Sequence, residues 1–130
     1  MFSVGAEAKS KKAYYLAHRI AESKYNGGLP NVFEVTKKSN KLTFRGELYK
    51  SSSASAFRKG KSSIVKNKTF KVTSKCKYRY TDFKGVHKVS QKKLIKETNR
   101  EYYEDATIEF KTNKSGNINY INLDVGSYRY

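Results

Sequence analysis

Apolar and cationic side chains alternate along residues 69–80, and this is the clearest pattern in the chain. One parity holds Phe70, Val72, Ser74, Cys76, Tyr78 and Tyr80. The other parity holds Thr69, Lys71, Thr73, Lys75, Lys77 and Arg79. Because successive residues of a strand point to opposite faces of a sheet, the pattern predicts a strand with one face toward a core and one basic face.

Two segments have the spacing of amphipathic helices. In residues 10–25, apolar residues recur at i, i+3, i+4 and i+7: Ala13, Leu16, Ala17 and Ile20. Ser10 is suited to cap this helix, and Asn26-Gly27-Gly28 to end it. In residues 90–105, Ser90 is the expected cap, and the residues expected to face inward are Leu94, Ile95, Thr98 and Tyr102.

Strands are expected at residues 31–38, 41–50, 64–80, 86–89, 106–111 and 117–125, which are rich in β-branched and aromatic residues. Lys37 to Asn40 suits a hairpin connection, Gly46 marks a bulge, and Asn67 is a candidate break. These elements predict an α+β fold, a compact single domain with a mostly antiparallel sheet of about five to six strands and two helices.

The expected domain covers residues 10–130, and a flexible terminus is expected at residues 1–9. The serine-rich segment 51–63 is interpreted as a mobile basic loop, with a short helix around Ala54 to Lys59 as the alternative.

Net charge indicates the class of partner. The chain has 28 Lys and Arg against 11 Asp and Glu, a formal net charge of +17. The 34 residues from Leu48 to Thr81 contain ten basic side chains and no acidic one. Such an imbalance attracts polyanions, and RNA or DNA is the partner that it favours. An acidic protein surface and an anionic membrane are the alternatives.

The candidate nucleic-acid-binding residues are basic side chains from the acid-free region and from the start of the second expected helix. They are Arg58, Lys59, Lys61, Lys66, Lys68, Lys71, Lys75, Lys77, Arg79, Lys92 and Lys93. Lysines at a helix N-terminus oppose the helix dipole, so a phosphate bound there would offset the mismatch. The alternative for Lys92 and Lys93 is an ordinary solvated helix face.

Tyrosines beside basic residues are candidate stacking platforms for unpaired bases: Tyr78, Tyr80, Tyr102, Tyr103, Tyr128 and Tyr130. By parity, Tyr78 and Tyr80 are expected to face the core instead.

The sequence indicates no catalytic residues, no metal site and no cofactor. His18, Cys76 and His87 have no recognised zinc spacing. A small metal-independent ribonuclease needs only an acid, a base and cations that hold phosphate. His87, Glu34, Arg45 and Arg79 are the residues that would supply them. The acids Glu97, Glu101, Glu104 and Asp105 are interpreted as a solvated helix face rather than a metal site.

No secretory signal and no membrane-spanning segment is recognised in the sequence. The single cysteine, Cys76, lies on the apolar parity and is interpreted as a small core residue in a reducing compartment, with a reactive thiol as the alternative. We therefore expect a cytoplasmic protein, or a protein of the host cytoplasm if a virus encodes it.

The expected first helix, followed by Leu29-Pro30-Asn31-Val32-Phe33-Glu34-Val35 and Leu42-Thr43-Phe44, resembles the opening of a double-stranded-RNA-binding domain over about a quarter of the chain. The chain departs from that family because no glycine-lysine loop leads into the second helix before Ser90. We do not assign the chain to that family.

The sequence therefore predicts a small nucleic-acid-binding protein that contacts the phosphate backbone through a basic strand face and the 51–63 loop, with little dependence on base sequence. The alternatives are the ribonuclease and an inhibitor whose basic face occupies an acidic site on a partner protein.

Overall fold

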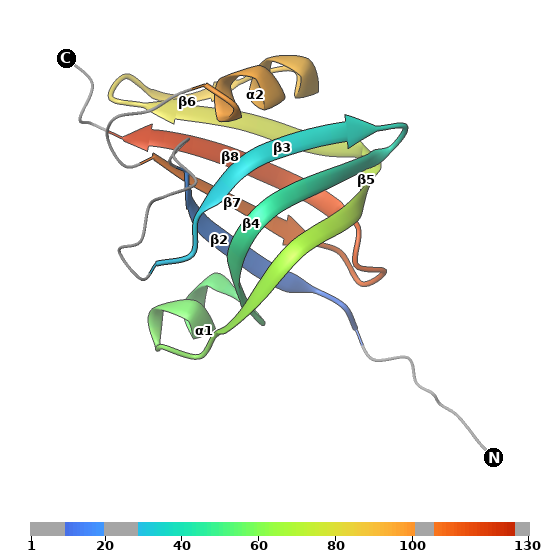
Figure 1. Cartoon of the computed structure of the whole chain (residues 1–130), viewed down its shortest axis with the longest axis vertical. Coiled ribbons are helices and arrows are strands. Elements are labelled where there is room, and N and C mark those ends of the chain that lie inside the picture. The colour runs from blue at the N-terminus through green and yellow to red at the C-terminus, as the bar shows by residue number, and fades with distance from the viewer. Residues whose placement is uncertain (1–9, 20–28, 101–105, 127–130) are drawn as a thin grey trace.

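Seven strands and two helices lie in the residues that the computed structural model describes, 10–19, 29–100 and 106–126 (Figure 1). The strands are β2 (Ala13–Arg19), β3 (Val32–Lys38), β4 (Lys41–Ser51), β5 (Ser63–Asp82), β6 (Gly85–Lys88), β7 (Ala106–Thr112) and β8 (Ile118–Gly126). The helices are α1 (Ala54–Arg58) and α2 (Gln91–Thr98). The fold is thus α+β in character and dominated by strands.

Five of the strands close into a barrel, in the order β4-β2-β7-β8-β5 and back to β4. Two long strands make this closure possible. One edge of β4 pairs with β3 and then β2, while its other edge pairs with the first half of β5. The second half of β5 pairs with β8 in parallel, and every other strand pair is antiparallel. The strands β3 and β6 extend the sheet beyond the ring.

The predicted first helix is wrong, because Ala13–Arg19 is strand β2. The strand lies between β4 and β7, and both of its faces are covered. Tyr15 belongs to the core cluster on the inside, while the outward Tyr14 packs on Phe57 of α1 at 5.9 Å between ring centroids. Burial on both faces hides the alternation that identifies a strand. The correction also removes the likeness to a double-stranded-RNA-binding domain, since that likeness began with a helix. Residues 20–25 of the predicted helix lie outside the described residues.

Most other predicted elements are confirmed, with small changes in extent. The hairpin of β3 and β4, the short strand β6 and the hairpin of β7 and β8 lie where they were expected. Helix α1 confirms the short helix near Ala54, within the segment expected to be a loop. Helix α2 begins at its predicted cap, with the Ser90 side chain accepting from the Lys93 amide at 3.1 Å, but it ends at Thr98.

A bulge interrupts the β4–β5 pairing where the sequence indicated one. Register shifts between Phe44 and Glu47, Gly46 has φ of 125°, and Asn67 has φ of 49°. The Asn67 side chain accepts from the Gly46 amide at 3.0 Å, which bridges the irregular segment. The predicted break at Asn67 is therefore a local distortion within one continuous strand.

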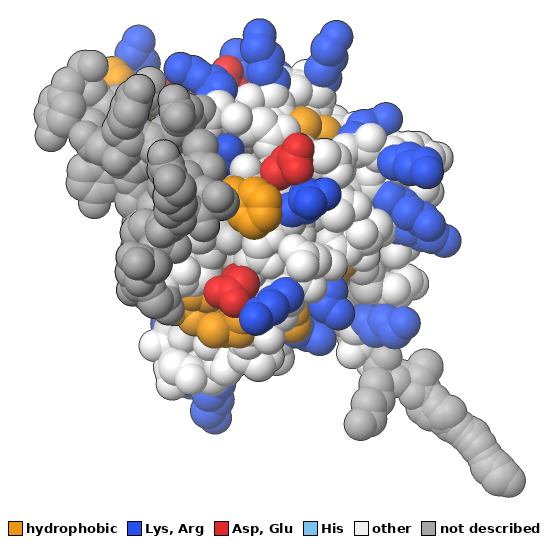
Figure 2. All heavy atoms as spheres, viewed as in Figure 1, with side chains coloured by type: hydrophobic (Ala, Val, Ile, Leu, Met, Phe, Trp, Pro, Cys, Tyr) orange, Lys and Arg blue, Asp and Glu red, His pale blue; other side chains and the backbone are white. Residues whose placement is uncertain are grey.

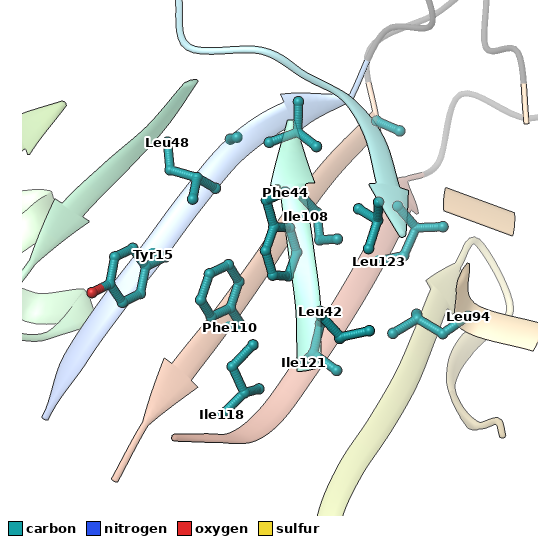
Figure 3. Close-up of a cluster of buried hydrophobic side chains, with 14 of the residues drawn as sticks. Tyr15, Leu42, Phe44, Leu48, Leu94, Ile108, Phe110, Ile118, Ile121 and Leu123 are labelled. Carbon is teal, nitrogen blue, oxygen red and sulfur yellow. The ribbon is translucent and has the colours of Figure 1, made fainter. Parts of the chain in front are cut away.

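Aromatic rings fill the middle of the barrel (Figure 3). Phe110 stacks on Phe44 at 4.5 Å and on Tyr15 at 4.7 Å, and Phe70 meets Phe110 edge-on at 5.1 Å. Rings in these arrangements add about 0.5–1.5 kcal/mol per pair to the effect of burial. From α2, Leu94 enters the same cluster and is 1% exposed.

Two polar side chains attach α2 to the barrel. Arg19 of β2 is 1% exposed and donates to the carbonyl oxygens of Thr98 and Arg100, where the negative end of the helix dipole lies. Asn99 pairs with both backbone groups of Val35 at 2.8 Å, so it occupies hydrogen-bonding positions on β3 as a neighbouring strand would.

Candidate nucleic-acid interface

Lys and Arg side chains are spread around the face seen in Figure 2, where the acidic side chains in view lie beside basic ones. Two acids of β3 and β4 are paired in this way: Glu34 with Arg45 at 3.3 Å, and Glu47 with Lys66 at 3.5 Å. Surface pairs of this kind contribute little to stability, but they lower the attraction of those cations for an external anion.

A basic cleft opens where β2 begins, β4 ends and β5 begins. Its volume is about 660 Å³, and its lining includes Lys11, Lys12, Lys50 and Lys61. No acidic residue lines it, and no ion pair joins any of the four ammonium groups to a carboxylate of the described residues. We call this site the basic cleft. Four like charges in one concavity create a strongly positive local field.

The backbone holds two of these lysines in place. Lys11 donates its amide to the Lys114 carbonyl at 3.0 Å, and its own carbonyl accepts from the Thr112 hydroxyl at 2.8 Å. The Lys61 carbonyl accepts from the Ser51 hydroxyl at 2.7 Å, and the Lys61 amide donates to Ala56 at 3.0 Å. The chain is therefore fixed beneath side chains whose charged ends have no acidic partner among the described residues.

Two aromatic side chains, Tyr15 and Phe70, form part of the cleft wall. In Figure 3 the Tyr15 hydroxyl points away from the Phe110 ring against which Tyr15 stacks. Burial raises the pKa of Tyr15, so its hydroxyl stays protonated at neutral pH and can donate a hydrogen bond. The cleft thus combines cations, a phenol and serine hydroxyls, which are donor groups suited to phosphate oxygens.

The predicted basic face of β5 is largely exposed. Lys71, Lys75 and Lys77 are exposed, while Phe70, Val72, Cys76, Tyr78 and Tyr80 pack against the core. The predicted inward parity fails at Ser74, which is exposed. Tyr78 and Tyr80 are thus core residues rather than stacking platforms, and the other candidate tyrosines lie outside the described residues.

Lysines face one another across three neighbouring strands on this side of the barrel. Lys38 of β3 is paired in register with Lys41 of β4, and Lys41 is paired with Lys71 of β5. Like charges directly opposite one another destabilise a sheet, and a bound polyanion would relieve that repulsion.

The remaining candidates are distributed over several elements. Lys61 lines the basic cleft, while Arg58 and Lys59 are exposed at the end of α1 just before it. Lys66 pairs with Glu47, and Lys68 is exposed. Arg79 is half-buried and donates to the Tyr78 carbonyl at 3.0 Å. Lys92 and Lys93 are exposed on α2, and Lys93 lines a second cleft of about 610 Å³ beside the β5–β6 hairpin.

Sequence reasoning missed Lys11, Lys12 and Lys50 as site residues. The first two preceded a segment interpreted as a helix, and nothing in their spacing links them to Lys61. The register of the sheet makes that link, because Tyr15 pairs with Lys50 and Lys50 with Ser63.

The residues named for a ribonuclease do not form one site. Glu34 pairs with Arg45 on β3 and β4, whereas His87 of β6 hydrogen-bonds Asp82 at 2.9 Å. The His87 interaction lowers the pKa of Asp82. Among the described residues, no group of three or more His, Cys, Asp or Glu side chains could hold a metal ion. Of the four acids considered for a metal site, only Glu97 lies within the described residues.

Cys76 packs against the core, as predicted. Burial raises the pKa of its thiol, an effect that the hydrogen bond with Tyr78 only partly offsets. The thiolate is the reactive form, so the alternative of a reactive thiol is not favoured.

We expect iodoacetamide to alkylate Cys76 in the folded protein at least about tenfold more slowly than in urea at the same mildly alkaline pH, because burial limits both thiolate formation and access. Mass spectrometry of samples quenched over time measures both rates. Equal rates, or faster reaction in the folded protein, would contradict this account of the thiol.

No helix of the described residues is long and apolar enough to cross a membrane. In comparisons with known proteins, no family model, curated protein or solved structure matches the chain.

Proposed function

We propose that this protein binds nucleic acid by holding the phosphate backbone in the basic cleft and along β5, with little dependence on base sequence. The observation that carries the proposal is the convergence of four lysines from three parts of the chain on one cleft without an acidic residue. Lysine ammonium groups bind phosphates as point charges, and the counterions they displace supply most of the binding free energy.

The basic face of β5 extends the same surface. The strand begins at the basic cleft, where Ser63 is part of the lining, and carries Lys71, Lys75 and Lys77 further along its length. A backbone that leaves the cleft along β5 would meet these exposed lysines in turn. None of the three has a carboxylate partner among the described residues.

The architecture of the barrel supports the proposal by analogy. Counted along the chain, its five strands follow the order 1-2-3-5-4 around the ring, and α2 lies between the third and fourth. In strand number, order and closure the barrel resembles the OB-fold, whose second and third strands form a face that binds oligonucleotides and oligosaccharides. Here those strands are β4 and β5, which carry Lys50 and the β5 lysines. The likeness is one of architecture alone.

Weak sequence preference follows from the chemistry of the interface. Its exposed groups are mainly lysines, which provide no fixed pattern of donors and acceptors for base edges. The single cysteine, half-buried and without a disulfide partner in the chain, fits a protein of a reducing compartment such as the cytoplasm.

The dependence of affinity on salt tests the proposal. If the four cleft lysines and the three β5 lysines each neutralise one phosphate, the slope of log K against log salt concentration is about −5 for a single strand and about −6 for a duplex. We expect a slope steeper than about −4 in fluorescence anisotropy titrations with oligonucleotides of several sequences, and similar affinities among them. A slope near zero would contradict the proposal and favour an interaction with a protein partner.

A ribonuclease would cleave the RNA during the same experiment. Gel analysis of RNA after prolonged incubation, with and without a chelator, separates the two functions: intact RNA is expected, and fragments whose formation requires His87 would favour the enzyme.

A further inference from the structure

The hairpin between β5 and β6 exposes two apolar side chains. Phe83, in its two-residue turn, is 61% exposed, and Val86 on β6 is 64% exposed. An aromatic ring left in water at the tip of a hairpin loses the stabilisation that burial would provide.

Neither the turn nor the core requires this ring. The turn is stabilised by the Asp82 carboxylate, which accepts from the Lys84 amide at 2.9 Å, and by Gly85 with φ of 121°. Such turns favour Asn, Asp and Gly rather than Phe. Phe83 is also not among the side chains packed against the core cluster. The fold therefore gives no structural reason for Phe83 at this position.

The surroundings of Phe83 are cationic. The Lys84 ammonium lies 5.7 Å from the centre of the ring. The second cleft, which adjoins the turn, is lined by Lys84, Lys88 and Lys93. Asp82 is the one acidic residue in its lining, and it is already paired with His87.

We propose that Phe83 stacks on an unpaired base of a single-stranded nucleic acid whose neighbouring phosphates lie among Lys84, Lys88 and Lys93. The proposal rests on the proposed function and adds a preference for single strands, because a duplex hides its base faces within the stack. Both clefts adjoin β5, which contributes Ser63 to the basic cleft and Tyr80 to the second cleft. One strand of nucleic acid following β5 can therefore reach both.

A single aromatic ring suits a base better than a membrane. Membrane association grows with the apolar area that is buried, and one Phe with one Val offers little of it. A base needs only one ring face, and cations on either side match the phosphates that precede and follow the base.

Replacing Phe83 by Trp provides a direct probe, since the chain contains no Trp and the fluorescence then reports on position 83 alone. We expect quenching by a single-stranded oligonucleotide and little change with a duplex of the same sequence. Vesicles of phosphatidylserine and phosphatidylcholine are the third ligand. A blue shift and rise in emission with vesicles, without quenching by the single strand, would overturn the proposal in favour of a lipid surface.

Affinity measurements complete the test. Phe83→Ala is expected to weaken single-strand binding about 5- to 100-fold and to leave duplex binding unchanged. Phe83→Leu, which keeps apolar bulk without a ring, should behave like the alanine variant. Val86→Ala on the same hairpin is the matched control and should bind like the parent protein.

The outcomes separate this proposal from the one on which it rests. If the parent protein binds with a steep salt slope but Phe83→Ala binds equally well, the stacking role is overturned and backbone binding stands. If the parent protein binds neither single strand nor duplex, both proposals are overturned.

Discussion

A variant carrying Lys11→Glu and Lys61→Glu is expected to bind a single-stranded oligonucleotide at least about a hundredfold more weakly than the parent protein. Each reversal removes an attraction for phosphate and adds a repulsion, which we take as about 1.4 kcal/mol, a factor of about ten. The slope of log K against log salt should also become shallower by about 2, one for each lost phosphate contact. Fluorescence anisotropy over a series of salt concentrations measures both quantities.

Folding should survive these two changes. The hydrogen bonds that fix residues 11 and 61 use backbone atoms, and neither ammonium group has a carboxylate partner among the described residues. A circular dichroism spectrum and a urea titration like those of the parent protein confirm this.

The matched control is a variant with Lys37→Glu and Lys96→Glu. Both residues are exposed, and neither lines the basic cleft or the second cleft. The net charge changes by the same amount, so this variant measures the effect of overall charge. Equal losses of affinity in the two variants would mean that the basic cleft is not the site and that the protein binds only through its general positive charge.

The second large effect concerns stability, and it is expected for Gly46→Ala. A Cβ atom at this position would lie 2.2 Å from the Asn31 carbonyl oxygen and 3.0 Å from the Val32 Cα, both of which belong to the backbone. Gly46 also has φ of 125°, a conformation that costs other residues about 1–3 kcal/mol. Since β3 must move to remove the overlap, we expect a total loss of about 3 kcal/mol or more in the free energy of unfolding.

Gly85→Ala separates the two causes. Gly85 has almost the same backbone angle, φ of 121°, but a Cβ there would meet nothing within 4 Å. This control should therefore lose only the cost of the backbone conformation. Urea titrations followed by circular dichroism give both values. A loss in Gly85→Ala as large as that in Gly46→Ala would show that the approach of β3 to β4 at Gly46 does not matter.

Most strand and helix positions could be predicted from local patterns, because those patterns have local causes. The alternation in residues 69–80 survives in the structure since β5 has one face on the core and the other in water. Ser90 was recognisable as a cap because a serine before an amphipathic segment can satisfy a free amide of the first helical turn. Gly46 and Asn67 indicated the bulge through their unusual conformational freedom.

The failures have a physical cause in long-range contacts. Strand β2 was interpreted as a helix because Tyr14 and Tyr15 are both buried, one under α1 and the other in the barrel. A residue whose outer face is covered by an element 40 or so positions away leaves no two-residue period to detect. The closure of the barrel was likewise invisible, since it depends on β4 and β5 each pairing with different strands along their length.

The sequence by itself determined the composition and sign of the interface and most of its local elements. An excess of 17 positive charges and an acid-free central region are properties of the chain in any conformation, and they favour an anionic partner. Only the tertiary structure decided where that charge converges. Lys11, Lys50 and Lys61 are far apart in sequence, and they share one cleft because the register of β2, β4 and β5 places the start of one strand beside the end of another. The tertiary structure also left Phe83 in water beside three lysines, because β5 and β6 meet in a turn that extends beyond the core.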